Sequence, residues 1–114
     1  MDIKIYGIKT CGTVRKTLKY FDEKNISYEF INFKKEPVNC DKIEQWINKV
    51  SIDTLFNNKG TKYRQLKLKE LNLDNEGKKQ WLCNENILIK RPVVEYNDKI
   101  IVGFNEEKYN EIFK

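Results

Sequence analysis

The sequence contains no histidine among its 114 residues. Without an imidazole, the chain cannot build a histidine-ligated metal site, and it cannot activate a serine or cysteine through a neighbouring histidine. Any nucleophile in this protein must therefore be activated by other groups, such as backbone dipoles or cationic side chains. The Ser-His and Cys-His classes of enzyme are excluded.

Cysteines and long apolar runs are also scarce. The three cysteines, Cys11, Cys40 and Cys83, are too few and too scattered to indicate a secreted disulfide framework or a zinc site. No apolar run approaches the ~20 residues that cross a bilayer, and the N-terminus lacks the apolar stretch of a signal peptide. We therefore expect a cytoplasmic protein that contacts no membrane and holds no metal.

The chain also lacks a block of like charge. Its net charge is +5, but its 22 basic residues are interleaved with 17 acidic ones. This pattern is typical of a solvated surface rather than a nucleic-acid face, so we expect no direct nucleic-acid partner. A hydrophobic fraction of 39% in 114 residues is enough for one packed domain, which we place at residues 1–114.

The first third of the chain has the pattern of a β-α-β unit. Residues 3–7 and 28–33 are rich in β-branched and aromatic side chains, which is typical of strands. Between them, the apolar residues of 12–24 recur at helical spacing, and Asn25 is expected to end this helix. A short crossover of this kind places the two strands parallel.

The last part of the chain has the pattern of a β-β-α unit. Residues 93–96 and 99–102 are strand-like, and the link Asn97-Asp98 favours a two-residue hairpin because both residues tolerate left-handed backbone. Asn105 then caps a terminal helix. The region between these two units, about 39–88, is predicted to be a helical insertion. Its helices are expected to begin at or near Asn39, Ser51, Gly60 and Glu76, the third of them reaching Leu71.

Cys11 lies at the junction between the first predicted strand and the first predicted helix. A helix N-terminus presents unpaired N–H groups and a partial positive charge, so it stabilises a thiolate and lowers the pKa of a thiol. Arg15 and Lys16 add positive charge in the first turn, Thr13 offers a hydroxyl, and Lys9 adds to the field. We predict a reactive thiolate; the alternative is a cysteine that packs beneath the helix.

The N-terminus of the same helix would bind a small oxyanion or a glutathione carboxylate. Gly12 and Lys9 are the candidate residues that contact this anion. Cys11 has no neighbouring partner, because the position of a Cys-x-x-Cys partner is Val14. An outside thiol or a distant cysteine must therefore resolve a mixed disulfide. We interpret Cys40 as an ordinary, partly buried cysteine and Cys83 as a small core residue, although either could be the distant partner.

Two further segments each have two interpretations. Arg91-Pro92 is either the plain start of an edge strand or a cis bond that brings the backbone against a reactive sulfur. The segment 58–64 is basic and contains Gly60, so it is either a binding loop or a simple junction between a loop and a helix.

These motifs together resemble the ArsC/Spx family over the whole length of the chain. "CGTVRKTL" is similar to the active-site stretch of glutaredoxin-coupled arsenate reductases, where Cys11 matches the nucleophile. "KRPVV" resembles the Arg-Pro segment of the family, which implies a cis bond before Pro92 and an anion-facing Arg91. "IIVGFNEEKY" is similar to the Spx and YffB-like branches, and "NNKGTKYRQL" to the YffB-like branch, where Arg64 matches a basic position. The implied fold is α/β and thioredoxin-like, with a mixed four-stranded sheet.

The sequence departs from the arsenate reductases and from the redox-switched Spx regulators of that family. Of the three arginines expected to hold arsenate, only Arg91 is matched, and the other two positions fall on Asn57 and Gly103. The loss of two charge-assisted contacts should weaken arsenate binding by roughly 3–6 kcal/mol. Val14 also occupies the place of the second cysteine of a redox-switched Spx regulator.

The resemblance therefore implies a monothiol thiol reductase of the YffB-like branch, dependent on glutathione or glutaredoxin. Cys11 would attack, Thr13 and Arg15 would assist, and Arg91 with Arg64 would hold an anionic group. Glutathione would be a co-substrate, and no bound cofactor is implied. The alternative is a Spx-like regulator that binds the RNA polymerase α C-terminal domain, and arsenate reduction proper comes third.

Overall fold

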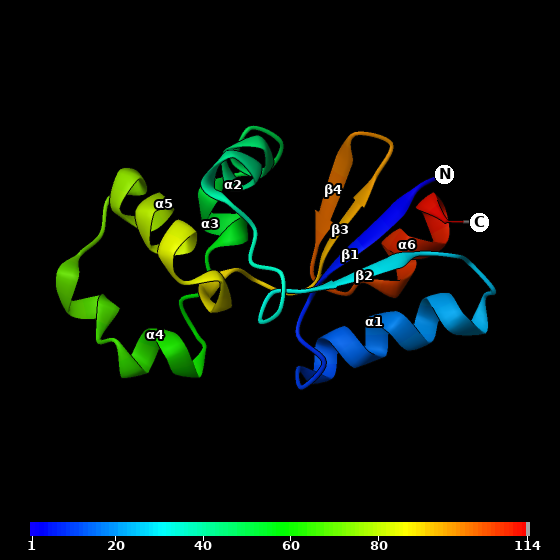
Figure 1. Ribbon diagram of the computed structural model, residues 1–114, viewed down its shortest axis with the longest axis horizontal. Coiled ribbons are helices and arrows are strands. Elements are labelled where there is room, and N and C mark those ends of the chain that lie inside the picture. The colour runs from blue at the N-terminus through cyan, green and yellow to red at the C-terminus, as the bar shows by residue number, and fades with distance from the viewer. Residues whose placement is uncertain (114) are drawn as a thin grey trace. The chain divides into compact units, whose positions relative to one another are not determined.

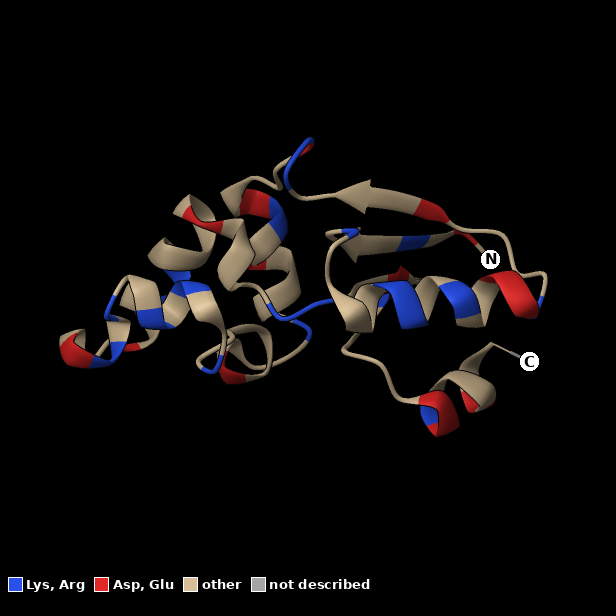
Figure 2. Ribbon diagram, turned by 90° about the horizontal axis from the view of Figure 1, so that it is seen from below, with Lys and Arg blue, Asp and Glu red and all other residues tan. Residues whose placement is uncertain are grey.

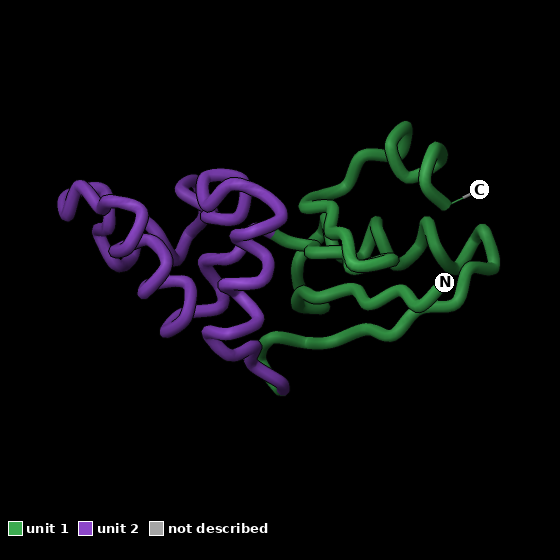
Figure 3. The backbone as a smooth tube through the Cα atoms, turned by 90° about the horizontal axis from the view of Figure 1, so that it is seen from above, with its two compact units in different colours: residues 1–35, 91–114 green, residues 36–90 purple. Residues whose placement is uncertain are grey.

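The computed structural model describes residues 1–113, which fold into two compact units (Figure 3). The first unit contains residues 1–35 and the segment that starts at Arg91, and the second contains residues 36–90. The predicted helical insertion, about 39–88, falls inside the second unit. That residues 1–114 act as a single domain stays a prediction.

The first unit is built on a four-stranded mixed sheet (Figure 1). Strand β1 pairs in parallel with β2 and antiparallel with β3, which pairs antiparallel with β4, in the order β2-β1-β3-β4. The sheet and its two helices form a thioredoxin-like fold, as predicted. The elements are β1 (Ile3–Gly7), α1 (Gly12–Glu23), β2 (Glu29–Asn32), β3 (Val93–Tyr96), β4 (Lys99–Val102) and α6 (Glu106–Ile112).

The turns of this unit form where the sequence predicts them. Asn25, just after α1, has a φ of 56°, and Asn97 and Asp98 between β3 and β4 have φ values of 46° and 60°. Asparagine and aspartate tolerate this left-handed region better than most residues. The predicted helix stop and the predicted two-residue hairpin are therefore confirmed.

The core of the first unit is aromatic and lies on one face of the sheet. Ile3, Ile5 and Val94 supply this face from β1 and β3, and helices α1 and α6 cover it. Tyr20 and Tyr109, one from each helix, meet edge to face with ring centroids 5.3 Å apart. Two helices on one side of the sheet thus bury the apolar residues that alternate along its strands.

Gly7 brings the end of β1 close to the start of α1. A Cβ atom at this position would lie 2.6 Å from Cγ2 of Val14, which is fully buried. Only a residue without a side chain allows this approach. The close contact holds the loop between β1 and α1 in place, and that loop carries Cys11.

The regular secondary structure of the second unit consists of helices, apart from one β-bridge between Phe56 and Ile89. The helix predicted after Gly60 does not reach Leu71, because Lys67 adopts a φ of 55° and separates α4 from a 3-10 turn. The elements of this unit are α2 (Cys40–Ile47), α3 (Ile52–Leu55), α4 (Thr61–Gln65), η1 (Leu68–Leu71), α5 (Asn75–Asn84) and η2 (Asn86–Leu88).

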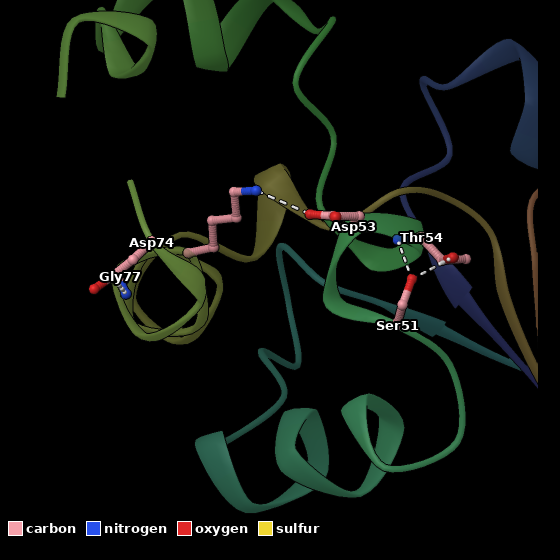
Figure 4. A network of polar contacts seen from close by, with 6 residues as sticks. Ser51, Asp53, Thr54, Asp74 and Gly77 are labelled. Atoms are coloured by element: carbon pink, nitrogen blue, oxygen red, sulfur yellow. Dashed lines mark hydrogen bonds and ion pairs between the residues drawn. The ribbon is translucent and has the colours of Figure 1, made fainter. Parts of the chain in front are cut away.

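Short polar side chains begin the helices of this unit. The hydroxyl of Ser51 accepts a hydrogen bond from the N–H of Thr54 at 3.1 Å, and the carboxylate of Asp74 accepts one from the N–H of Gly77 at 2.8 Å (Figure 4). Asn39 caps α2 in the same way, and Asn105 caps α6 in the first unit. The three caps predicted from sequence, at Asn39, Ser51 and Asn105, are confirmed.

Cys40 and Cys83 form a disulfide that joins α2 to α5, with their Cα atoms 5.0 Å apart. The sequence-based interpretation of these residues was therefore wrong. Cys40 is exposed rather than partly buried, and Cys83 is a bonded, partly exposed residue rather than a free core residue. The pairing depends on how α2 packs against α5, and a separation of 43 residues carries no local sign of it.

The charged residues are mixed along the helices of both units (Figure 2). In α1, for example, Lys19 lies 3.8 Å from Glu23 one turn later. Within residues 1–113, no helix is both long enough and apolar enough to span a membrane.

Candidate active site

Cys11 is the N-cap residue of α1 and the free cysteine of the chain. Its backbone is extended, with φ −80° and ψ 123°, and its carbonyl accepts the first helical hydrogen bond, from the N–H of Arg15 at 3.0 Å. The side chain is partly exposed. A cysteine in this position faces the unpaired N–H groups of the first helical turn while remaining open to a reactant.

The surroundings of Cys11 lower the pKa of its thiol. Partial burial is the largest single influence and raises the pKa, but several groups together outweigh it. These are the N–H of Val14, the side chain of Arg91, the N–H of Thr13 and the positive charge of Arg91. The two amides lower the pKa as hydrogen-bond donors, because a donor to the sulfur stabilises the charged thiolate more than the neutral thiol.

Arg91 reaches Cys11 because of the pairing of β1 with β3. The two strands run antiparallel with Tyr6 opposite Val93, so the segment before β3 lies beside the segment after β1. Arg91 lies in the former segment, two residues before β3, and Cys11 ends the latter segment, immediately before α1. The bond between Arg91 and Pro92 is cis, which confirms the expectation from the family resemblance.

The basic residues near Cys11 in sequence have different partners. The guanidinium of Arg15 donates to the carbonyl of Lys9 at 3.2 Å, and the ammonium of Lys16 lies 5.3 Å from the ring centroid of Phe104. None of these cations is among the groups that shift the pKa of Cys11. The cation among the groups that lower this pKa is Arg91, and the assistance expected from Arg15 stays a prediction.

Thr13 acts on the sulfur through its backbone, and Gly12 leaves space at the start of α1. The N–H of Thr13 acts on the sulfur, and its carbonyl accepts a hydrogen bond from the hydroxyl of Thr17 at 2.9 Å. A role for the Thr13 hydroxyl stays a prediction. Gly12 is the first residue of α1, and a Cβ atom there would have no heavy atom within 4 Å. The space beside Cys11 is thus open at Gly12.

Arg64 lies in the second unit, where its side chain binds to residues of the preceding loop. Its guanidinium donates to the carbonyl of Lys59 at 2.7 Å and to the hydroxyl of Thr61 at 3.4 Å. The neighbouring Asn58 and Tyr63 line a cavity of about 290 Å³ within this unit. The role of Arg64 in binding an anion stays a prediction.

The two positions that depart from the arsenate-binding arginines are occupied by structural residues. The side chain of Asn57 accepts a hydrogen bond from the N–H of Lys59 at 3.1 Å. Gly103 has a φ of 86°, and its N–H donates to the carbonyl of Pro92 at 2.8 Å. Gly103 therefore supports the segment that carries Arg91, although it has no side chain to offer an anion.

Sequence reasoning missed one group at the site, the N–H of Val14. Its influence is the largest among those that lower the pKa of Cys11. From the sequence, Val14 was interpreted only as the residue that replaces a second cysteine. The available signal was its position, because the third residue after an N-cap is the usual donor to that cap.

The fold and the position of Cys11 define the chain as a thioredoxin-like protein with a candidate thiol site at its first strand–helix junction. The chain belongs to the ArsC family, whose model matches residues 6–112. An uncharacterised protein of Haemophilus influenzae is 32% identical, covering 97% of this chain and 98% of its own length. A protein of Neisseria meningitidis named arsenate reductase is 27% identical, covering 90% of each chain.

Solved structures show the same relationship. A structure named YffB protein superimposes with a TM-score of 0.91 at 27% identity, covering 98% of this chain and 99% of the other. A solution structure of a Staphylococcus aureus protein has a TM-score of 0.78 at 37% identity and covers 96% of each chain. The chain is thus related to arsenate reductases along nearly its whole length.

Proposed function

We propose that this protein is a monothiol reductase that removes glutathione from mixed disulfides, with Cys11 as the nucleophile. The observation that carries the proposal is the lowered pKa of a partly exposed Cys11 with Arg91 beside it. A low pKa supplies thiolate near neutral pH, and the thiolate is the form that attacks sulfur. We place the reaction in the cytoplasm, where reduced glutathione is maintained.

The first step forms a mixed disulfide on the protein. The Cys11 thiolate attacks the glutathione sulfur of a substrate R–S–S–G, a bond forms between Cys11 and glutathione, and the substrate leaves as R–S⁻. The leaving thiolate takes a proton from solvent. The reduced product is released, and its two electrons come from the Cys11 thiolate.

The second step returns the protein to its starting form. A free glutathione thiolate attacks the glutathione sulfur of the mixed disulfide, glutathione disulfide is released, and Cys11 leaves as a thiolate. A leaving thiol with a low pKa leaves faster, so the groups that activate Cys11 in the first step also favour the second. A glutaredoxin thiol could replace free glutathione in this step.

Arg91 has two roles in this proposal. Its guanidinium favours the thiolate of Cys11 and is suited to a carboxylate of glutathione, because a planar guanidinium can donate two parallel hydrogen bonds. The N–H groups at the start of α1 add a second site of positive potential for that carboxylate. Arg64 is kept as a predicted additional contact, which a substitution can test separately.

The test is the glutathione-dependent reduction of a peptide–glutathione mixed disulfide by the wild type and by variants. Cys11→Ser should lose the activity, and Arg91→Gln should lower kcat/KM because both the thiolate and the anion contact are weakened. Arg15→Gln is the matched control, because the guanidinium of Arg15 donates to the carbonyl of Lys9 and is not among the groups that lower the pKa of Cys11. This variant should retain activity. Activity that survives in Cys11→Ser contradicts the proposal.

Arsenate is a second candidate substrate, supported by the relatives named arsenate reductase and by Arg91 next to Cys11. We expect poor reduction, because Asn57 and Gly103 supply no guanidinium at their positions. Saturable reduction of arsenate coupled to glutaredoxin would support arsenate as the substrate. The adaptor alternative has a separate test, a pull-down with the RNA polymerase α C-terminal domain, in which Cys11→Ser should still bind.

A further inference from the structure

The second unit carries a pair of sulfur atoms that the proposed reaction does not use. We propose that Cys40 and Cys83 form a second, reversible thiol–disulfide site that exchanges with thiols of low molecular weight, such as glutathione, independently of Cys11. The pair lies within residues 36–90, and it is already joined in a disulfide. In cytoplasmic proteins, such disulfides are usually transient, catalytic or redox-sensing rather than permanent.

The first argument for this site is accessibility. Cys40 is exposed and Cys83 is partly exposed, so a small thiolate can approach the disulfide without unfolding of the unit. The Cα atoms are 5.0 Å apart, which is within the ordinary range for a disulfide, so the bond can reform after opening without a backbone movement.

The second argument is that the two helices have other contacts that hold them together. The ammonium of Lys79 lies 2.8 Å from the carboxylate of Glu44. Lys79 is one turn before Cys83 in α5 and Glu44 is one turn after Cys40 in α2, so this ion pair bridges the same two helix faces. Ile43 and Trp46 of α2 and Leu82 of α5 are fully buried. The helix pair therefore remains packed when the disulfide opens.

The exchange begins at Cys40 in both directions. During reduction, a glutathione thiolate attacks Sγ of Cys40, the bond to Cys83 breaks, and Cys83 leaves as a thiolate. A second glutathione thiolate then attacks the glutathione sulfur, which releases glutathione disulfide and the Cys40 thiolate. Oxidation by glutathione disulfide follows the reverse path, with two electrons moving from the cysteine pair to glutathione.

Exposure rather than local charge selects Cys40 as the first residue to react. Cys40 is the first residue of α2, where the helix dipole favours a thiolate, but the neighbouring carboxylate of Asp41 opposes that effect. The difference in accessibility between an exposed Cys40 and a partly exposed Cys83 remains. We therefore expect Cys40 to form a mixed disulfide several-fold faster than Cys83.

The experiment uses the full chain with Cys11→Ser, so that the reaction of Cys11 does not interfere. The protein is treated with glutathione disulfide, then with reduced glutathione under native conditions, and free thiols are alkylated and counted by intact mass. We expect no alkylation after oxidation, two alkyl groups after reduction, and recovery of the disulfide on reoxidation. The fluorescence of Trp46 and Trp81, which both lie in this unit, should stay native throughout.

Three results would overturn the proposal: a disulfide that opens only in denaturant, a disulfide that does not form with glutathione disulfide, or opening accompanied by a denatured fluorescence signal. The order of attack is tested with Cys83→Ser and Cys40→Ser, each added to Cys11→Ser. Glutathione disulfide should modify Cys40 in the first variant several-fold faster than Cys83 in the second. Equal or reversed rates contradict the assignment of Cys40. Because Cys11 is absent, these outcomes are independent of the proposed reductase activity.

Discussion

At the scale of single residues, the property of Cys11 that matters is the balance of influences on its pKa. Partial burial opposes ionisation, while two amide groups and one guanidinium favour it, and the net result is a lowered pKa. The guanidinium comes from Arg91, 80 positions away in sequence, and not from Arg15 four positions away. Proximity in sequence was therefore a poor guide to which cation acts on this sulfur.

The lowered pKa of Cys11 predicts how stability depends on pH. The folded protein releases the proton of Cys11 at a lower pH than the unfolded chain, where an unperturbed thiol titrates at about 8.5. Between these two values the unfolded state binds more protons, so stability rises with pH. The contribution is complete above about 8.5 and is lost as the pH falls through the folded pKa.

The measurement is the free energy of unfolding of the wild type minus that of Cys11→Ser, taken at a series of pH values with the disulfide intact. Other titrating groups are common to both proteins and cancel in the difference. We expect the difference to grow as the pH rises from neutral to about 8.5 and then to level off. A difference that falls over this range means that folding raises the pKa of Cys11.

At the scale of secondary structure, the junction between β1 and α1 is what positions the thiol. Gly7 allows the close approach of these elements, while Gly12, at the start of the helix, faces open space. The two glycines have different physical roles, although both lie within six residues of one another.

Substitution of these glycines should separate their roles. Gly7→Ala places a Cβ atom 2.6 Å from a methyl group of the buried Val14, so we expect a loss of roughly 1–3 kcal/mol of unfolding free energy. Gly12→Ala meets nothing within 4 Å and favours the helix, so stability should be unchanged or raised by up to about 1 kcal/mol. Denaturant unfolding checks both, and equal losses contradict this assignment.

The helix caps give a second prediction at this scale. The side chain of Asn105 accepts a hydrogen bond from the N–H of Lys108 at 3.0 Å at the start of α6. Asn105→Ala should therefore cost about 1 kcal/mol of stability, whereas Asn105→Asp keeps an acceptor and should cost much less. Thermal or denaturant unfolding of both variants provides the measurement, and the account is wrong for this cap if the two behave alike.

Elements were predictable from sequence where their signals are local. Caps such as Asn39 and Asn105 act within three residues, and Asn97-Asp98 determines a hairpin by its own backbone preferences. The break after α4 was missed because Lys67 has no local signal for a φ of 55°. A lysine adopts that conformation only when the surrounding structure requires it.

At the scale of the whole molecule, the order of elements was predicted from sequence and the family resemblance implied the thioredoxin-like sheet, but the site depended on contacts between distant segments. The register of β1 with β3 brings Arg91 to Cys11, and the packing of α2 against α5 brings Cys40 to Cys83. The family resemblance supplied Arg91 as an anion-facing residue. Neither the family resemblance nor a local sequence pattern predicted the disulfide between Cys40 and Cys83.

The disulfide should contribute to the stability of the second unit. Closing a loop with a sequence separation of 43 residues restricts the unfolded chain, and the chain-entropy relation gives about 4 kcal/mol as an upper value. We expect Cys40→Ser with Cys83→Ser to unfold at lower denaturant concentration, as followed by the fluorescence of Trp46 and Trp81. Cys11→Ser is the control that removes no cross-link, and a double variant as stable as this control contradicts the prediction.

The central claim is that backbone amides of α1 and the guanidinium of Arg91 ionise Cys11 despite its partial burial. Its most direct test is the pKa of Cys11, obtained from the pH dependence of alkylation in the protein with the Cys40–Cys83 disulfide intact. The account predicts a pKa below that of a free thiol in the wild type, an unchanged pKa in Arg15→Gln, and a raised pKa in Arg91→Gln. A wild-type pKa at or above the free-thiol value, or one that Arg91→Gln leaves unchanged, would contradict it.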